Sequence, residues 1–474
     1  MMIRKIFVGL FLTIGLCAVA QNEKDTTLIS QFVDHYNKKE YGLVYALFSD
    51  NMQQKTPLVQ IEGLLGGLNA AVGTIKQTEF VAKDEAGFSH NKTSFEKGIF
   101  DVAISEDGNG KMAGFKIVPF VEEDFSRKVS NQLKSEGDLP STLQTELIFE
   151  FCKSFPNQTE LAIGLIVAGK PKYYGVKMVN DSLFTVENYQ KTYEIGSISK
   201  VFTATLLAHQ VYKGSAALED EISSYFDFPF HQETSLTLKM LANHSSGLPR
   251  LPSNLDLTTV DPQNPYKAYD AKMLEDYLRK ELNVPSGALG TYQYSNLGAG
   301  LLGQVLVKQA GESYETLLQT HIAQKYGMKN TTSLSERVSS SWVKGLDAKG
   351  KETSNWDFDV LVGAGGIRST MEDMMQFTLA QFDTNDKVLG LTRKETIRTN
   401  DKMGVGLGWH IRKSESGRDW VWHNGGTGGY SSSLSFNPET QNGIIVLSNV
   451  SGLSPKMGFI DKLCFQLLES IEAK

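Results

Sequence analysis

The hydrophobic pattern of residues 25–120 predicts helices first and strands afterwards. From 100 to 104 apolar and polar residues alternate, and a Gly/Asn-rich turn at 107–110 separates this segment from a similar one at 115–119. Before them, apolar residues are spaced three and four apart in three segments, as on helices with one buried face: Leu28, Phe32, Val33, Tyr36, Val44, Leu47, Phe48, Leu58, Ile61, Leu64, Leu65 and Leu68. Helices followed by a β-meander predict a small α+β domain.

The rest of the chain predicts a second, larger domain. Residues 121–142 are charged and poor in apolar side chains, which is typical of a linker. A helical segment then leads into the apolar run 162–167, and a return strand follows at 173–176. No internal repeat interrupts the chain, and a length of 474 residues suits two or three domains. We therefore expect one large domain over 143–474.

The N-terminus predicts an export signal. A positively charged start, the apolar run 6–16 and the small residues 18–20 have the order of a secretory signal peptide. The run is short for a membrane span, and no later apolar stretch is long enough for one. A retained anchor is the alternative, and Cys17 would suit a lipoprotein signal, although the bulky Leu16 before it fits poorly. With residues 1–20 removed, we expect a periplasmic or secreted protein.

Composition and charge narrow the function classes. The net charge is -7 and the chain is 41% hydrophobic, an ordinary globular balance that argues against a nucleic-acid partner, which needs a basic face. We expect no metal or cofactor, because no His/Asp/Glu cluster has metal spacing and no phosphate-binding loop occurs. Cys152 and Cys464 remain after signal removal. In an oxidising compartment they form either one disulfide or two separate buried thiols.

Candidate chemistry begins at Ser197 and Lys200. Residues three apart on a helix share a face, so this serine and lysine lie within hydrogen-bonding reach. An alcohol needs a base beside it to attack, and a lysine serves only where burial or a nearby charge lowers its pKa. The same spacing begins at Ser89, Ser94 and Ser341, but only Ser197 precedes a long apolar helix. We therefore predict a Ser197 nucleophile with Lys200 as its base.

Two later segments contain polar groups that are suited to proton transfer and to orientation of a substrate. The Tyr294 phenol suits proton transfer between nucleophile, leaving group and lysine, and the Asn296 amide suits orientation of Lys200 or a carbonyl. His423 precedes Gly425 and Gly426 in a glycine-rich strand, where a substrate can approach the backbone closely. Each segment alone is weak evidence, because Tyr-x-Asn commonly starts a capped helix and a lone histidine is usually structural.

In this order, Ser-x-x-Lys, Tyr-x-Asn and a basic residue before x-Gly resemble the class C serine β-lactamases, the D,D-peptidases and related esterases. Three further segments, 243–249, 363–370 and 406–409, resemble the same family. The resemblance covers about residues 143–468. It implies an antiparallel sheet flanked by helices, with a helical subdomain, as the larger part of an α+β multidomain protein. Its terminal helices pack together, which makes a Cys152–Cys464 disulfide plausible.

The first domain resembles the cone-shaped domains related to nuclear transport factor and ketosteroid isomerase. This resemblance rests on the order of its elements and on the phrase Lys-Gly-Ile-Phe-Asp at 97–101. The segment contains no isomerase-like constellation of Asp and Tyr. The resemblance therefore implies an accessory binding or spacing domain.

The resemblance also implies roles for the candidate residues. Ser197 attacks a carbonyl and is acylated, Lys200 takes its proton, and Tyr294 passes a proton to the leaving group. Asn296 holds the carbonyl or Lys200, and the N–H groups of Ser197 and Gly426 form an oxyanion hole. The resemblance also places His423 and Gly425 at positions that orient the substrate.

His423 stands where many relatives carry the lysine of a Lys-Thr-Gly triplet. A lysine is a fixed cation for a substrate carboxylate, whereas histidine is largely neutral near pH 7. An ester, amide or D-amino-acid peptide, cell-wall fragments included, is therefore at least as good a substrate as a β-lactam. The alternatives are a penicillin-binding sensor, a weakly active β-lactamase or D,D-carboxypeptidase, and a ligand-binding function centred on the first domain.

Overall fold

The chain divides into two compact units, Met1–Phe125 and Ser126–Lys474. No helix among the residues whose structure is described is long and apolar enough to cross a membrane. The expected export signal lies outside the described part of the chain. The computed structural model describes residues 28–83, 87–120, 127–135, 139–338 and 341–473.

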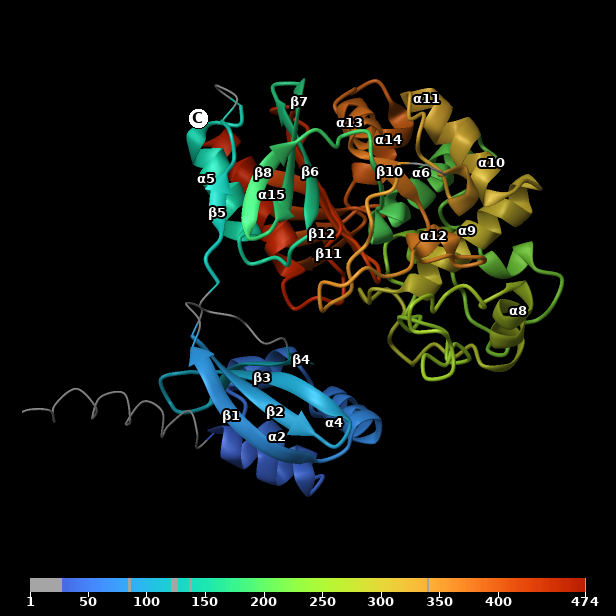
Figure 1. The fold of residues 1–474 in the computed structure, drawn as a ribbon. Coiled ribbons are helices and arrows are strands. Elements are labelled where there is room, and N and C mark those ends of the chain that lie inside the picture. Colours follow the sequence, from blue (N-terminus) through green and yellow to red (C-terminus); the bar gives the residue numbers. More distant parts are fainter. Residues whose placement is uncertain (1–27, 84–86, 121–126, 136–138, 339–340, 474) are drawn as a thin grey trace, which may run out of the picture. The chain divides into compact units, whose positions relative to one another are not determined.

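The first unit packs helices on one four-stranded antiparallel sheet with the order β1-β2-β3-β4 (Figure 1). Phe32, Tyr36 and Leu65 of the helices share a buried core with Phe95 and Val102 of the sheet. The predicted order of helices and meander is confirmed. The elements are the helical residues 28–37, α2 Tyr41–Ala46, α3 Asp50–Lys55, α4 Leu58–Val72, β1 Ile75–Lys83, β2 Phe88–Phe95, β3 Gly98–Glu106 and β4 Met112–Pro119.

The second unit is built on a ten-stranded sheet with the order β11-β12-β13-β14-β15-β16-β6-β7-β8-β5. Its strands are β5 Ser130–Gln132, β6 Glu160–Val167, β7 Lys170–Val179, β8 Ser182–Val186, β11 Ile397–Asn400, β12 Met403–Val405, β13 His410–Lys413, β14 Asp419–Gly426, β15 Ser431–Asn437 and β16 Asn442–Ser448. A separate pair joins β9 Thr192–Glu194 to β10 Arg368–Thr370.

Helices cover this sheet and form a subdomain beside it (Figure 1). The α-helices are α5 Thr142–Cys152, α6 Ser199–Tyr212, α7 Leu238–Ala242, α8 Ala271–Lys280, α9 Asn296–Ala310, α10 Tyr314–Leu318, α11 Gln324–Tyr326, α12 Val362–Gly365, α13 Met371–Ala380, α14 Lys387–Arg393 and α15 Gly458–Glu472. The other helical turns are η1 Gly196–Ile198, η2 Ile222–Tyr225, η3 Gln319–Ala323 and η4 Ser335–Arg337.

The centre of the sheet is buried on both faces. In β16, Ile444 and Val446 pack into a core with α5 and α15, whereas Ile445 and Leu447 pack into the core that contains α6 and α13. Because strand side chains alternate between faces, this uninterrupted apolar run serves both layers. The result is a three-layer arrangement in which α6 lies between the sheet and the helical subdomain.

Part of the expected linker 121–142 belongs to the sheet. β5 pairs in parallel with β8, and Val129 and Leu133 pack against the core beneath α5 and α15. Among the described residues of this segment, the few apolar side chains that pack on this core, Leu139 included, are only partly buried and lie between polar and charged ones. Its sequence therefore lacks the periodicity by which a strand is usually predicted.

Of the two alternatives that the sequence left open for Cys152 and Cys464, the structure has two buried free thiols and no disulfide between them. Helices α5 and α15 do pack against each other, as the resemblance implies. The Cys464 thiol, however, lies 3.5 Å from the carbonyl oxygen of Ile444, so it contacts the sheet. Burial raises the pKa of both thiols, which suits inert core residues.

The end of α15 is held by the carboxylate of Glu472. It accepts hydrogen bonds from Asn442 at 2.9 Å, from Asn437 at 3.0 Å and from Thr440, and it pairs with Arg418 at 2.9 Å. Burial alone would raise the pKa of Glu472, but these hydrogen bonds outweigh burial and lower it to about 2. The ionised carboxylate therefore stabilises the fold.

Glu472→Gln should lower the free energy of unfolding by roughly 2–3 kcal/mol at pH 7, because one charged acceptor of four hydrogen bonds is lost. The pKa of Glu472 is lower in the folded chain than its ordinary value of 4.5. Its stabilisation is therefore complete above pH 4.5 and lost as the pH falls toward 2. Urea denaturation of both proteins across this range measures the difference. Glu469→Gln, one turn earlier on α15, is the matched control: burial raises the pKa of Glu469, so folding does not favour its ionised form and the substitution should not lower the free energy of unfolding.

Candidate active site

Ser197 lies in the helical turn η1, which leads directly into α6. The turn is anchored by Ile195, whose N–H donates to the carbonyl of Ile367 at 3.1 Å, and Ile195 and Ile198 are fully buried. Ser197 itself is partly exposed. Because α6 is buried along most of its length, this serine stands on a rigid element and still faces outward.

The Lys200 amine lies beside this hydroxyl. Its Nζ is 3.0 Å from Ser197 Oγ and 2.7 Å from the carbonyl oxygen of Ala364, and the residue is 2% exposed. Burial, and secondarily the positive charge of Arg250, hold the pKa of Lys200 well below its ordinary value of 10.5. A lysine of lowered pKa has a lone pair with which to accept a proton.

Tyr294 completes the group around Ser197. Its ring centre lies 4.8 Å from Lys200 Nζ, and the Ser197 hydroxyl is close enough to influence the pKa of its phenol. Burial raises the pKa of Tyr294, so the phenol carries its proton. Ser295 fixes this segment as the N-cap of α9, because its Oγ accepts from Gly298 N at 2.8 Å and donates to the carbonyl of Pro249 at 2.6 Å.

Asn296 begins α9 on the same side of the site. Its Nδ2 lies 3.4 Å from the hydroxyl of Tyr266, so within the described residues its hydrogen bond goes to this tyrosine and not to Lys200. The Oδ1 atom is buried and has no partner in the described structure. Of the two roles expected for Asn296, contact with a substrate fits this arrangement better.

Gly425 and Gly426 bring the end of β14 against the Ser197 turn. A Cβ atom on Gly425 would lie 2.0 Å from the carbonyl oxygen of Ile195 and 2.9 Å from Ser197 N. A Cβ on Gly196, whose φ is +51°, would lie 2.5 Å from Gly426 N. Only glycine permits this approach of two backbones. The amides of Ser197 and Gly426 thus lie on adjoining segments.

His423 belongs to a cluster of buried histidines that sequence analysis did not find. Its ring lies 5.2 Å from that of His410 and 6.4 Å from that of Tyr294, and the His244 ring lies 4.5 Å from Tyr294. Burial lowers the pKa of all three histidines, and the nearby Lys200 adds to this effect. His244 lies inside the segment 243–249, and His410 directly follows the segment 406–409. Both segments carry the family resemblance, which was the sequence signal by which these two histidines could have been found.

These histidines do not form a metal centre. Among the described residues, no three His, Cys, Asp or Glu side chains are arranged to hold a metal ion. Each histidine uses one ring nitrogen: His423 Nδ1 lies 2.6 Å from the carbonyl of Asn424, His410 Nε2 lies 2.9 Å from the Tyr292 hydroxyl, and His244 Nδ1 accepts from Ser295 N. The other ring nitrogen of each is buried without a partner in the described structure.

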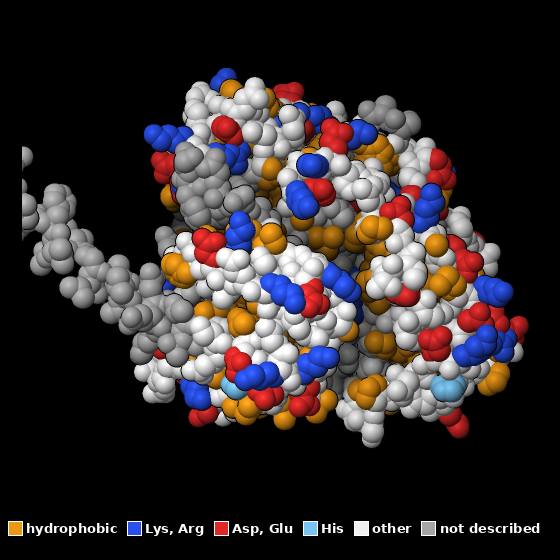
Figure 2. Space-filling model, turned by 60° about the horizontal axis from the view of Figure 1, so that its bottom comes forward, with side chains coloured by type: hydrophobic (Ala, Val, Ile, Leu, Met, Phe, Trp, Pro, Cys, Tyr) orange, Lys and Arg blue, Asp and Glu red, His pale blue; other side chains and the backbone are white. Residues whose placement is uncertain are grey.

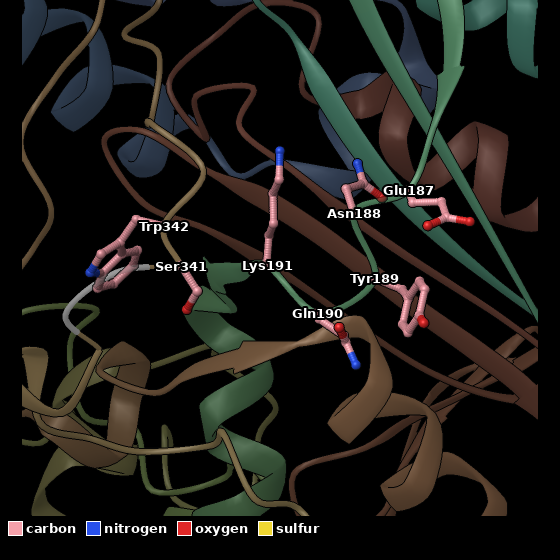
Figure 3. Close-up of a pocket in the computed structure, with 7 residues that line it drawn as sticks. All are labelled: Glu187, Asn188, Tyr189, Gln190, Lys191, Ser341 and Trp342. Carbon is pink, nitrogen blue, oxygen red and sulfur yellow. The ribbon is translucent and has the colours of Figure 1, made fainter.

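The other serines with a lysine three residues later lack this arrangement. Ser341 Oγ lies 3.0 Å from Thr192 Oγ1, and Lys344 is exposed. Ser341 lines a hollow of about 400 Å³ together with residues 187–191 and Trp342. Figure 3 shows these seven side chains. Neither Ser197 nor Lys200 lines it. Ser89 and Ser94 lie on β2 of the first unit, where residues three apart do not share a helical face.

The ten-stranded sheet and the site around Ser197 define a class of protein. The large unit has the fold of the serine hydrolases that include β-lactamases and penicillin-binding proteins. The Beta-lactamase family model matches residues 159–462, and the chain belongs to this family. Residues 30–115 match a second family, which is described only as a protein of unknown function, DUF3887.

Relatives and solved structures agree with this assignment. A Beta-lactamase of Escherichia coli (strain K12) is 28% identical over 62% of this chain and 85% of its own length. Penicillin-binding protein 4* of Bacillus subtilis is 25% identical over 54% of this chain and 60% of its own. The class C beta lactamase structure from Rhodobacter sphaeroides aligns with a TM-score of 0.57 and 20% identity, over 70% of this chain and all (100%) of that one.

Proposed function

We propose that this protein is a serine hydrolase that acts through a covalent acyl-enzyme on Ser197. The observation that carries the proposal is the 3.0 Å separation between Ser197 Oγ and the buried Lys200 amine. A neutral amine at this distance can remove the hydroxyl proton as the oxygen attacks. The signal-like residues 1–20 support export to the periplasm or beyond the cell.

Each step has a group in place. Lys200 takes the proton of Ser197, whose Oγ forms a bond to the substrate carbonyl carbon. The N–H groups of Ser197 and Gly426 stabilise the oxyanion. When the tetrahedral intermediate collapses, Tyr294 protonates the leaving alcohol or amine and regains a proton from Lys200. Water then attacks the acyl-enzyme by the reverse sequence and releases the acid.

The acyl donor proposed is an ester, an amide or a D-amino-acid peptide. Burial, His410 and Lys200 hold the pKa of His423 well below its ordinary value, so this position has no cation for a β-lactam carboxylate. A penicillin-binding sensor, a weakly active β-lactamase or a D,D-carboxypeptidase is the second candidate. The likeness to Penicillin-binding protein 4* and to a Beta-Lactamase/D-Alanine Carboxypeptidase structure from Pseudomonas syringae favours it.

Labelling with an alkyl fluorophosphonate tests the proposal. Intact-mass and peptide analysis should place one phosphonyl group on Ser197, because its hydroxyl lies 3.0 Å from the buried Lys200 amine, whose pKa is lowered. Ser197→Ala should abolish labelling and ester hydrolysis, whereas Ser341→Ala, with the same lysine spacing, should change neither. An unlabelled Ser197, or hydrolysis that persists in Ser197→Ala, would contradict the proposal.

The second candidate is separated by the fate of the adduct. A hydrolase releases the acyl group from nitrocefin, short-chain esters or D-Ala-D-Ala peptides, and the mass of the free enzyme returns. A sensor retains the penicilloyl mass on Ser197 for hours without turnover. Time-resolved mass spectrometry with this panel distinguishes the two.

A further inference from the structure

Arg250 places an unpaired cation at the edge of the Ser197 site. Its side chain is exposed, and its guanidinium carbon lies 5.3 Å from the ring centre of Tyr294. The charge is close enough to influence Lys200, His244 and Tyr294. No acidic side chain of the described residues forms an ion pair with it.

Most arginines of the large unit are paired with a carboxylate, unlike Arg250. Over the face shown in Figure 2, basic and acidic side chains are interspersed. Six other arginines of the large unit have carboxylate partners: Arg127 with Asp181, Arg279 with Glu275, Arg337 with Glu315, Arg368 with Asp357, Arg398 with Glu395 and Arg418 with Glu472. Of the remaining two, Arg393 donates to Gln381 and Arg412 lies over the ring of Phe465. Arg250 instead lies over the face of Tyr294, beside a serine that is open to solvent.

The backbone holds Arg250 in this place. Its carbonyl oxygen accepts from Asn296 N at 2.9 Å and from Leu297 N at 3.1 Å. The preceding carbonyl, of Pro249, accepts from Ser295 Oγ at 2.6 Å. The segment that ends in Arg250 is therefore tied to the same turn that presents Tyr294 and Asn296. These bonds fix the backbone of Arg250 beside the Tyr294 turn, and its side chain extends over the ring of Tyr294.

We propose that Arg250 binds a carboxylate of the substrate, so that the substrate class of Ser197 is an anionic ester or amide. The inference rests on the proposed function. His423 occupies the strand position at which a lysine would supply a cation, and it is neutral; Arg250 supplies a cation next to Tyr294. A guanidinium fork matches a carboxylate in two parallel hydrogen bonds, and stacking on an aromatic ring preorganises it.

The test compares two fluorophosphonates of equal chain length, one ending in a methyl group and one in a carboxylate, at three chain lengths. The measurement is the second-order rate of Ser197 labelling by mass spectrometry. The wild type should favour the carboxylate reagent at one length or more. Arg250→Gln should lower that rate about 10-fold or more, since a charge-assisted hydrogen bond is lost. Arg250→Lys should retain part of the preference.

The ratio of the two rates isolates binding of the carboxylate. Arg250→Gln also removes a charge that lowers the pKa of Lys200, but this change affects both reagents equally. Arg279→Gln, on α8 and paired with Glu275, is the matched control and should leave the ratio unchanged. If Ser197 is labelled but no length shows a preference, or the preference survives in Arg250→Gln, the Arg250 inference is wrong. If neither reagent labels Ser197, the proposed function itself fails.

Discussion

Lys200→Arg is expected to slow acylation of Ser197 by about 10³-fold. The replacement retains a basic side chain of similar length, but a guanidinium is not deprotonated in proteins and cannot accept the serine proton. The lowered pKa of Lys200 follows from burial and from Arg250, so the proposed mechanism depends on a neutral amine at this position. The measurement is the single-turnover rate of labelling by an alkyl fluorophosphonate.

Two controls separate loss of the base from loss of the fold. Lys200→Met retains the volume of the side chain without an amine, and it should show a similar loss of rate. Lys344→Arg, three residues after Ser341 and exposed, should label Ser197 as fast as the wild type. Near-ultraviolet circular dichroism confirms native packing in each. Rapid labelling of a folded Lys200→Met variant would remove Lys200 from the mechanism.

The same lysine gives a pH dependence of stability that needs no substrate. Because the pKa of Lys200 is lower in the folded chain than its ordinary value of 10.5, the unfolded chain binds more protons between the two values. Stability of the wild type relative to Lys200→Met should therefore rise with pH up to 10.5. Thermal denaturation of both proteins across this range gives the difference. A difference that is independent of pH would indicate an ordinary lysine pKa.

The sequence predicted the parts of the site that depend on local spacing. Ser197 and Lys200 share one helical turn, and Tyr294 and Asn296 flank one N-cap, so each pair could be placed without knowledge of the tertiary fold. The helices and meander of the first unit were predictable for the same reason. Strands β1 and β2 were not, because β2 places the polar Ser89, Asn91 and Thr93 in buried positions and breaks the expected alternation.

The groups that sequence analysis missed depend on contacts between distant segments. His244, His410 and His423 come from three separate parts of the chain and meet only around Tyr294. Arg250 directly follows the segment 243–249, which carries the family resemblance. Its position over Tyr294, however, depends on hydrogen bonds between its backbone and the start of α9. The state of the two cysteines was left open for a similar reason: the packing of α5 on α15 was predictable, whereas the direction of the Cys464 thiol was not.

Gly425→Ala should reduce acylation of Ser197 by about 10²-fold or more, because displacements near 1 Å in an active site have effects of this size. The new Cβ would lie 2.0 Å from the Ile195 carbonyl oxygen and 2.6 Å from Ser432 Oγ. The first contact is with backbone, which cannot rotate away. The end of β14 must therefore move from the Ser197 turn, and the amides of Ser197 and Gly426 separate. Overpacking should also lower the free energy of unfolding by about 1–3 kcal/mol.

Gly390→Ala provides the matched control, because this glycine lies in α14 and a Cβ there meets no atom within 4 Å. It should leave acylation unchanged and raise stability by roughly 0.5–1 kcal/mol, the usual gain from Gly to Ala in a helix. The Lys200–Ser197 pair contains no atom of Gly425, so slow labelling of a folded Gly425→Ala variant would assign the loss to the two amides. Labelling at the wild-type rate would show that the junction of β14 with the Ser197 turn does not stabilise the oxyanion.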